Sequence, residues 1–198
     1  MSTPGGRSPL DQGRPAKCTV DPLPDACRTG GVSRTRALID NLPYIIMILC
    51  GAALCLAGPG GPAWRWASAI VYAVYGVVGA LWIMFFVCPY CHFYDTRLCP
   101  CGYGRIAARL RPRQETGQFA RQFRRHIPVI VPLWFLPLVA AGVGLVREFT
   151  WFLLGLAIVF AVNSFLVLPL VSRKYGCKTC PQKDGCPWMG PSAATPTT

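Results

Sequence analysis

Acidic residues are scarce in this chain, and histidine is scarcer still. The 198 residues include 8 aspartates and glutamates and 2 histidines, against 20 lysines and arginines. The four most apolar stretches contain no aspartate, glutamate, lysine or histidine: residues 42–58, 63–87, 127–146 and 149–171. Proton-coupled carriers and haem-bearing helices need such groups at membrane depth, so we expect neither class.

The motifs of self-contained nucleotide enzymes and hydrolases are missing as well. The chain contains neither G-x-x-x-x-G-K-[ST] nor G-x-S-x-G. What the chain does contain is 53% hydrophobic residues and 11 cysteines. Thiols are therefore the only reactive groups that the sequence offers for a function.

The apolar stretches predict an all-α integral membrane protein with four transmembrane helices, arranged as two hairpins. About 20 helical residues cross a hydrocarbon core of about 30 Å, so the last three stretches are long enough. The first stretch, with 17 residues, is marginal. Three prolines should bend the third helix, and four polar residues should hydrogen-bond between helices: Pro128, Pro132 and Pro137, and Tyr72, Tyr75, Asn163 and Ser164.

The positions of the basic residues predict the orientation. Eighteen of the 20 precede the first helix, lie between the second and third, or follow the fourth, whereas the two remaining turns hold Arg65 and Arg147. By the positive-inside rule, both termini and the middle segment face the cytosol. We therefore expect a multi-pass protein of the inner (plasma) membrane, whose net charge of +12 reflects topology and not nucleic-acid binding.

The chain accordingly divides into two membrane hairpins and three cytosolic segments. The first segment is rich in proline, glycine, arginine and serine, which predicts disorder. The expected order is a disordered cytosolic tail 1–36, hairpin 37–87, a cysteine-rich and basic loop 88–126, hairpin 127–171, and a cysteine-rich tail 172–198.

This orientation places no cysteine outside the cell. Cys50 and Cys55 lie within the first helix, where cysteine is an ordinary small buried residue. Cys18 and Cys27 lie in the N-terminal tail and are expected to be unliganded. The other seven face a reducing compartment, where structural disulfides are rare.

Those seven thiols form two spaced sets, each next to the end of a membrane helix. The sets are Cys88, Cys91, Cys99 and Cys101, and Cys177, Cys180 and Cys186, with His92 as a possible eighth ligand. A C-x2-C turn lets two sulfurs converge on one ion, and a second pair completes a tetrahedron. The sequence therefore predicts a cytosolic metal module that ties the second helix to the fourth.

The spacing leaves the metal open between zinc and an iron–sulfur cluster. Proline follows four of these cysteines, as is frequent in cluster-binding loops, but a tight zinc knuckle also uses such turns. Four thiolates satisfy either cofactor.

Two local resemblances concern the thiols. The tetrapeptide Cys-Pro-Tyr-Cys at residues 88–91 is similar to the active-site motif of glutaredoxins, which implies a nucleophilic first thiol. Here that thiol ends a helix, where the dipole disfavours a thiolate. Four spans with paired cysteines also resemble the vitamin K epoxide reductase family, whose redox cysteines work on the outer face, opposite to the orientation expected here.

Two basic stretches, residues 105–111 and 118–126, follow the first cysteine set and are expected to be short helices. In the second, Phe119 and Phe123 recur at four-residue spacing while three arginines occupy other faces, which is typical of a helix at a lipid surface. Anionic headgroups are the expected partner, and an acidic protein surface is the alternative.

Three functions remain open. A zinc module indicates a scaffold or assembly factor with a cytosolic or membrane protein partner. An iron–sulfur cluster indicates an electron-transfer subunit. The third is a soft-metal or thiol-handling carrier, in which Cys50 and Cys55 pass an ion to the cytosolic thiols.

Overall fold

The computed structural model of the chain describes residues 32–177 together with Cys180, Gln182 and Cys186. These described residues form helices and turns, without a strand. Almost all of the tail 1–36 and most of the tail 172–198 lie outside them, as do Cys18 and Cys27. Four helical runs are long and apolar enough to cross a membrane, which confirms the expected number of spans: Thr35–Ala57, Pro62–Tyr90, Thr116–Arg147 and Trp151–Lys174.

Each span is built from one or more consecutive helical elements. In chain order the elements are α2 (Arg34–Ala57), α3 (Pro62–Phe86), η2 (Cys88–Tyr90), α4 (Tyr103–Leu110), η3 (Thr116–Gln118), α5 (Phe119–His126), η4 (Ile127–Ile130), α6 (Pro132–Arg147), α7 (Trp151–Val162), η5 (Asn163–Val167), α8 (Leu168–Val171) and η6 (Ser172–Cys177). The short elements η2, η3 and η4 are 3-10 turns, whereas η5 and η6 are π-helical.

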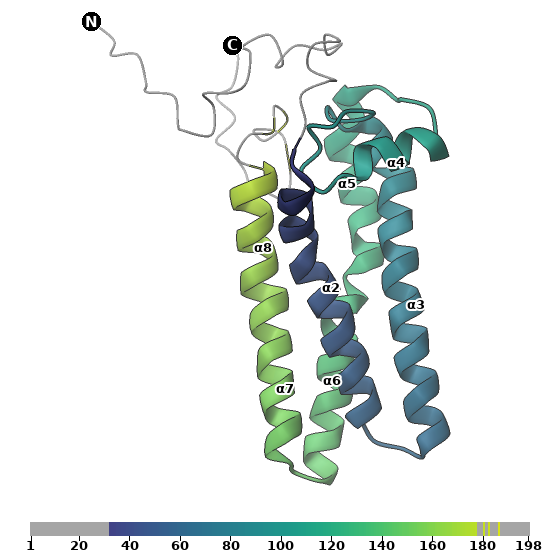
Figure 1. The fold of residues 1–198 in the computed structure, drawn as a ribbon. Coiled ribbons are helices and arrows are strands. Elements are labelled where there is room, and N and C mark those ends of the chain that lie inside the picture. The colour runs from purple at the N-terminus through teal and green to yellow at the C-terminus, as the bar shows by residue number, and fades with distance from the viewer. Residues whose placement is uncertain (1–31, 178–179, 181, 183–185, 187–198) are drawn as a thin grey trace, which may run out of the picture.

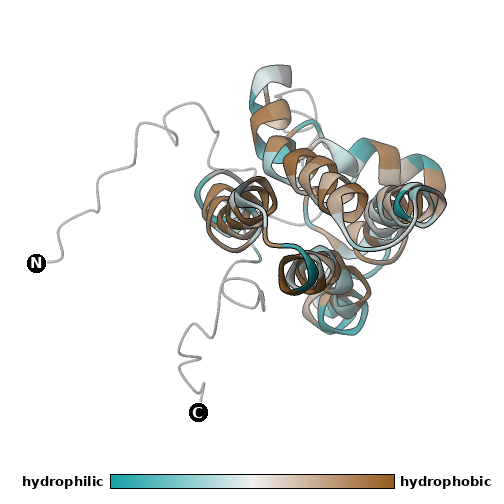
Figure 2. Cartoon of the chain, turned by 90° about the horizontal axis from the view of Figure 1, so that it is seen from below, coloured by the Kyte–Doolittle hydropathy of each residue, from teal (hydrophilic) through white to brown (hydrophobic). Residues whose placement is uncertain are grey.

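The spans run side by side with α2 at the centre of the packing. Helix α2 contacts α3, α6 and α7, and α6 also contacts α7. The α2–α3 and α6–α7 turns lie at one end of the bundle, and α4 and α5 lie at the other (Figure 1). Seen end on, hydrophobic residues lie on all sides of the bundle, and many large apolar side chains are exposed, as lipid contact requires (Figure 2).

The first span is longer than its apolar residues suggested. Ser33 caps α2, because its hydroxyl accepts a hydrogen bond from the N–H of Arg36 at 3.2 Å. The helix therefore starts eight residues before Leu42, and the span measures 23 residues instead of a marginal 17. The spans are also not free of carboxylates, contrary to expectation, because Asp40 lies within this added segment.

Prolines interrupt the third span as expected. The run changes from α5 to a 3-10 turn at Ile127–Ile130, and α6 then starts with Pro132 at its first position. Proline is favourable there because the first residues of a helix have no intrahelical partner for their N–H groups. Pro137 lies inside α6, where its missing N–H leaves the carbonyl of Leu133 without its helical donor.

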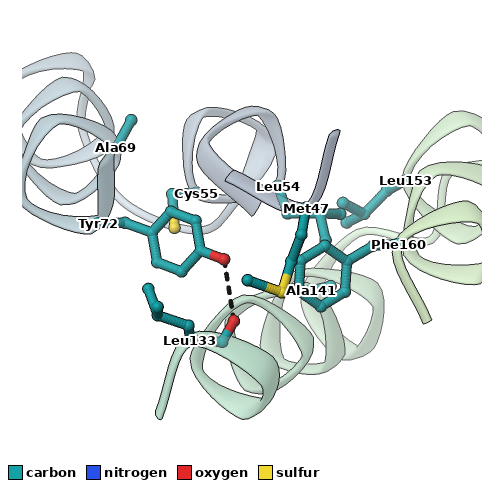
Figure 3. Close-up of a cluster of buried hydrophobic side chains, with 9 residues drawn as sticks. All are labelled: Met47, Leu54, Cys55, Ala69, Tyr72, Leu133, Ala141, Leu153 and Phe160. Carbon is teal, nitrogen blue, oxygen red and sulfur yellow. Dashed lines mark hydrogen bonds between the residues drawn. The ribbon is translucent and has the colours of Figure 1, made fainter. Parts of the chain in front are cut away.

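Tyr72 supplies that missing donor from the neighbouring helix α3. Its hydroxyl donates to the carbonyl oxygen of Leu133 at 2.9 Å, within a buried cluster drawn from all four spans (Figure 3). A Cβ at Gly51 of α2 would overlap the ring of Tyr72, so glycine is required for the ring to reach this position. The hydrogen bond satisfies a polar group that has no access to water in the bilayer.

The other polar residues of the spans behave similarly. Tyr75 donates to the carbonyl of Val129, and the amide of Asn163 donates to the carbonyl of Pro43 at 2.8 Å. These contacts confirm the expected hydrogen bonds between helices for Tyr72, Tyr75 and Asn163. Ser164 is buried, and its hydroxyl has no hydrogen-bond partner among the described residues.

The two basic stretches are helical, as expected. They form α4 and α5, which lie beyond the membrane end of α3 (Figure 1). The rings of Phe119 and Phe123 contact each other, with centroids 5.9 Å apart. Helix α5 runs on through η4 into α6 within one helical run of 32 residues, so it is joined directly to the third span. Its contact with a lipid surface stays a prediction.

Candidate functional site

The first cysteine pair lies on a tight turn at the end of α3. Residues Cys88–Tyr90 form the 3-10 turn η2, and the N–H of Cys91 donates to the carbonyl of Cys88 at 3.0 Å. Pro89 follows Cys88 at the start of this turn, where no N–H is needed. The turn brings the two residues of the C-x2-C motif back toward each other.

The second pair lies on another turn, which requires two glycines. The N–H of Gly102 donates to the carbonyl of Cys99 at 3.1 Å, and Gly102 has a left-handed φ of 76°. A Cβ at Gly104 would overlap the carbonyl oxygen of Phe93, which lies on the first turn. The carbonyl of Gly104 in turn accepts from the N–H of Asp95 at 3.1 Å. The two turns are thus packed backbone against backbone.

This packing brings four of the predicted ligands together. Phe93, Leu98 and Cys99 form a small buried cluster, and three more thiols pack against it: Cys91, Cys101 and Cys180. The sulfurs of Cys99 and Cys101 are 3.8 Å apart. Four thiolates around a zinc ion at about 2.3 Å lie about 3.8 Å from one another in a regular tetrahedron, so this pair has the spacing of one tetrahedral edge.

The surroundings of Cys99 favour its thiolate form. Its sulfur accepts a hydrogen bond from the thiol of Cys101 and from backbone N–H groups of Gly104, Tyr103 and Cys101, which together lower the pKa of Cys99 to about 7 in spite of its burial. Donation to Cys99 and burial raise the pKa of Cys101. N–H groups that point at a thiolate are also the usual environment of a sulfur that binds a metal ion.

Cys91 has the opposite tendency. Burial is the main cause that raises the pKa of its thiol, and the neighbouring Cys99 and Cys88 raise it further, although the N–H of Phe93 points at its sulfur. A second thiolate beside Cys99 is therefore unfavourable unless a cation neutralises the pair. A bound metal ion reverses this balance, because thiolates coordinate it directly.

The C-terminal segment reaches the first turn through Gln182. Its side-chain oxygen accepts from the N–H of His92 at 2.9 Å, and its nitrogen donates to the carbonyls of Tyr90 at 3.3 Å and Thr116 at 3.1 Å. These contacts hold Cys180 beside the first cysteine set. Cys186 is half-buried, and Cys177 ends η6 with a side chain that the structure does not describe.

His92 lies on the first turn with 4% of its surface exposed. Its ring contacts Phe93 edge-on, and its Nε2 atom has no hydrogen-bond partner within the described part of the chain. A buried imidazole nitrogen without a partner is costly, which is compatible with a ligand role. His92 thus adjoins the thiol cluster through its contact with Phe93.

The start of α2 is a neighbour of the thiols that the sequence did not reveal. The amide of Asn41 donates to the carbonyl of Cys101 at 3.0 Å, and the N–H of Val32 donates to the carbonyl of Arg97 at 2.8 Å. Asp40 interacts electrostatically with Cys101. The sequence signal for this contact is the polar segment between the capping Ser33 and the first apolar residues. A prediction of the helix start from apolar residues alone does not include that segment.

No group of three or more His, Cys, Asp or Glu side chains in the described ranges is arranged so that it could hold a metal ion. The thiol cluster therefore supplies one pair at ligand spacing, with further thiols packed around it, and the metal module stays a prediction. Cys50 and Cys55 pack within the membrane core, in keeping with the interpretation that they are ordinary buried residues.

No protein-family model, curated protein or solved structure matches the chain. The surroundings of the Cys-Pro-Tyr-Cys tetrapeptide are helices and turns throughout the described residues, without the strands of a glutaredoxin.

Proposed function

We propose that this multi-pass membrane protein binds a metal ion through the thiolates at one end of its bundle and serves as a scaffold or assembly factor. The observation that carries the proposal is the Cys99–Cys101 pair, with sulfurs 3.8 Å apart and backbone N–H groups pointing at Cys99. Cys91 and Cys180 pack against the same cluster. Binding requires the loop to draw these sulfurs together around the ion.

The ligands are Cys88, Cys91, Cys99 and Cys101 as the primary set, with Cys180 reaching the cluster from the tail. His92, Cys177 and Cys186 are further ligands of the same module. Zinc is favoured, since the spacing of Cys99 and Cys101 matches one edge of a mononuclear tetrahedral site. Structural zinc sites stabilise small loops of this kind, which suits a docking surface.

The proposed orientation places this module in the cytosol, with two membrane hairpins. It is supported by the charge distribution, since 18 of the 20 basic residues belong to segments at the cysteine-rich end. The arginines of α4 and α5 then face the anionic headgroups of the inner leaflet or an acidic protein partner.

Metal analysis of protein purified without oxygen tests the proposal. We expect stoichiometric zinc, its loss in Cys99→Ser and its retention in Cys50→Ser, which changes a thiol of the membrane core. A brown protein that contains iron and absorbs broadly in the visible range would contradict the scaffold function and favour the electron-transfer function. Protein that binds neither metal would contradict both functions.

Thiol-labelling of intact cells tests the orientation. We expect Cys186 to resist a membrane-impermeant maleimide and to react once the membrane is opened and a chelator has removed the metal ion. Labelling from outside would place the module on the outer face and contradict the proposed location.

A further inference from the structure

The end of the bundle opposite to the thiols carries two adjoining cavities of different character. The larger, about 750 Å³, lies between α3 and α6 and is lined almost entirely by apolar side chains, among them Trp64, Val71 and Val139. The smaller, about 290 Å³, is lined by polar groups of both turns. Gly58 and Pro59 line both cavities, so the two adjoin each other at the α2–α3 turn.

The smaller cavity contains the two basic residues that lie outside the cysteine-rich end of the bundle. Arg65 and Arg147 both line it, as does Glu148, so the cavity carries a net charge of +1. The Nε atom of Arg65 is buried and has no hydrogen-bond partner within the described residues. A buried guanidinium nitrogen without an acceptor is costly, and an anion with several oxygens would satisfy it.

We propose that these cavities bind one anionic glycerophospholipid, with its phosphate between Arg65 and Arg147 and an acyl chain between α3 and α6. The combined chemistry identifies the ligand class. A free phosphate would leave the apolar cavity unused, and a helix of a second copy would leave the arginines unpaired. The apolar volume lies within the usual range of about 300 to 1,000 Å³ for ligand pockets.

The location fits this ligand as well. Both turns lie at one end of the bundle, where a span meets the headgroup region (Figure 1). Trp64 lines the apolar cavity near the start of α3, and tryptophan is favoured at that depth. The lipid would fill the space between α3 and α6, which contact each other less extensively than α2 and α3 do.

Native mass spectrometry after exchange with vesicles tests the proposal. The probes are vesicles of phosphatidylglycerol and of phosphatidylcholine with identical acyl chains. We expect retention of phosphatidylglycerol to exceed that of phosphatidylcholine about fivefold, because the choline cation offsets the phosphate of phosphatidylcholine, and one unit of headgroup charge beside a basic site is worth about 1 kcal/mol. Equal retention of the two lipids by the wild-type protein would overturn the proposal.

Four variants test the headgroup contact and the acyl-chain contact separately. Arg65→Gln combined with Arg147→Gln should reverse the preference, because Glu148 then leaves the smaller cavity with a negative charge, while both lipids still bind. Glu148→Gln should raise the preference about fivefold. Val139→Trp should obstruct the apolar cavity and lower retention of both lipids. The matched control Val78→Trp changes an exposed residue of α3 outside the cavity and should leave retention intact.

Circular dichroism and detergent-resistance measurements verify that each variant folds. A preference that survives the double arginine change would overturn the phosphate position. A dimer that dissociates in Val139→Trp would show a second copy in the cavity, and displacement of phosphatidylglycerol by an equimolar isoprenoid phosphate would show a different lipid class. Either result would overturn the proposal.

Discussion

At the cysteine-rich end, three backbone N–H groups point at the sulfur of Cys99. In the spans the opposite holds, because prolines remove N–H groups and leave carbonyls without donors. The carbonyl of Leu133 is satisfied by the neutral hydroxyl of Tyr72. N–H groups that converge on one sulfur stabilise an anion there, whereas a carbonyl without its helical donor in lipid requires a neutral donor from another helix.

The cysteine-rich end is therefore suited to bind a cation through thiolates, whereas the spans are suited to remain uncharged. Changes that remove the donors at the cysteine-rich end should affect thiol chemistry and leave the spans intact. Changes that remove the tyrosine donor should affect the stability of the spans and leave the thiols intact.

The largest effect is expected from Gly104→Val. A side chain there would overlap the carbonyl of Phe93 and separate the two turns. We expect a loss of about 3 kcal/mol in loop stability, measured as faster maleimide labelling of Cys99 in detergent. Gly142→Val is the control, since a Cβ at Gly142 meets no atom within 4 Å. Equal labelling of both variants would show that the turns do not depend on this contact.

The next largest effect concerns Tyr72→Phe, which leaves the carbonyl of Leu133 unpaired. We expect a loss of about 1.5 kcal/mol in the free energy of unfolding, measured by titration with a denaturing detergent.

The companion variant is Pro137→Ala, which restores an N–H within reach of the Leu133 carbonyl. In that background Tyr72→Phe should cost far less, because the helix supplies the donor itself. An undiminished cost would mean that Tyr72 acts through packing alone.

A smaller effect is expected from Cys101→Ala in metal-free protein. Loss of the thiol donor should raise the pKa of Cys99 from about 7 toward its ordinary value. Because folding lowers this pKa, the thiolate stabilises the loop at alkaline pH, and that stability is lost as the pH falls through about 7.

The ultraviolet absorbance of the thiolate measures this shift during a pH titration. A rise of one pH unit corresponds to about 1.4 kcal/mol. An unchanged midpoint would show that the backbone N–H groups alone hold the thiolate. Cys50→Ala serves as the control, because Cys50 packs against the membrane core.

The smallest effect is expected from Gly102→Ala. The left-handed φ of 76° costs a residue with a side chain about 1 kcal/mol. Zinc affinity should fall about fivefold, as followed by competition with a chromogenic chelator. Gly142→Ala, in α6, should leave the affinity unchanged.

The membrane class followed from the sequence because long runs without charge have one stable environment. The number of spans could be predicted for the same reason. The second basic stretch could be predicted as a helix from the four-residue spacing of its phenylalanines, and the interhelical role of Tyr72, Tyr75 and Asn163 from the need of polar groups in a span for a partner. The start of α2 could not be predicted from apolar residues, since the cap at Ser33 sets it.

The candidate site also has features that could be predicted from the sequence and features that could not. The sequence by itself determined which thiols exist, their spacing and the turns that proline and glycine impose, because these depend on local backbone geometry. Only the tertiary structure decided that Cys180 packs against the thiol cluster, next to the contacts of Gln182. It also decided that Asn41 donates to the second turn and that Tyr72 donates to the carbonyl of Leu133. These contacts join residues that are far apart in the chain, and packing of the spans brings them together.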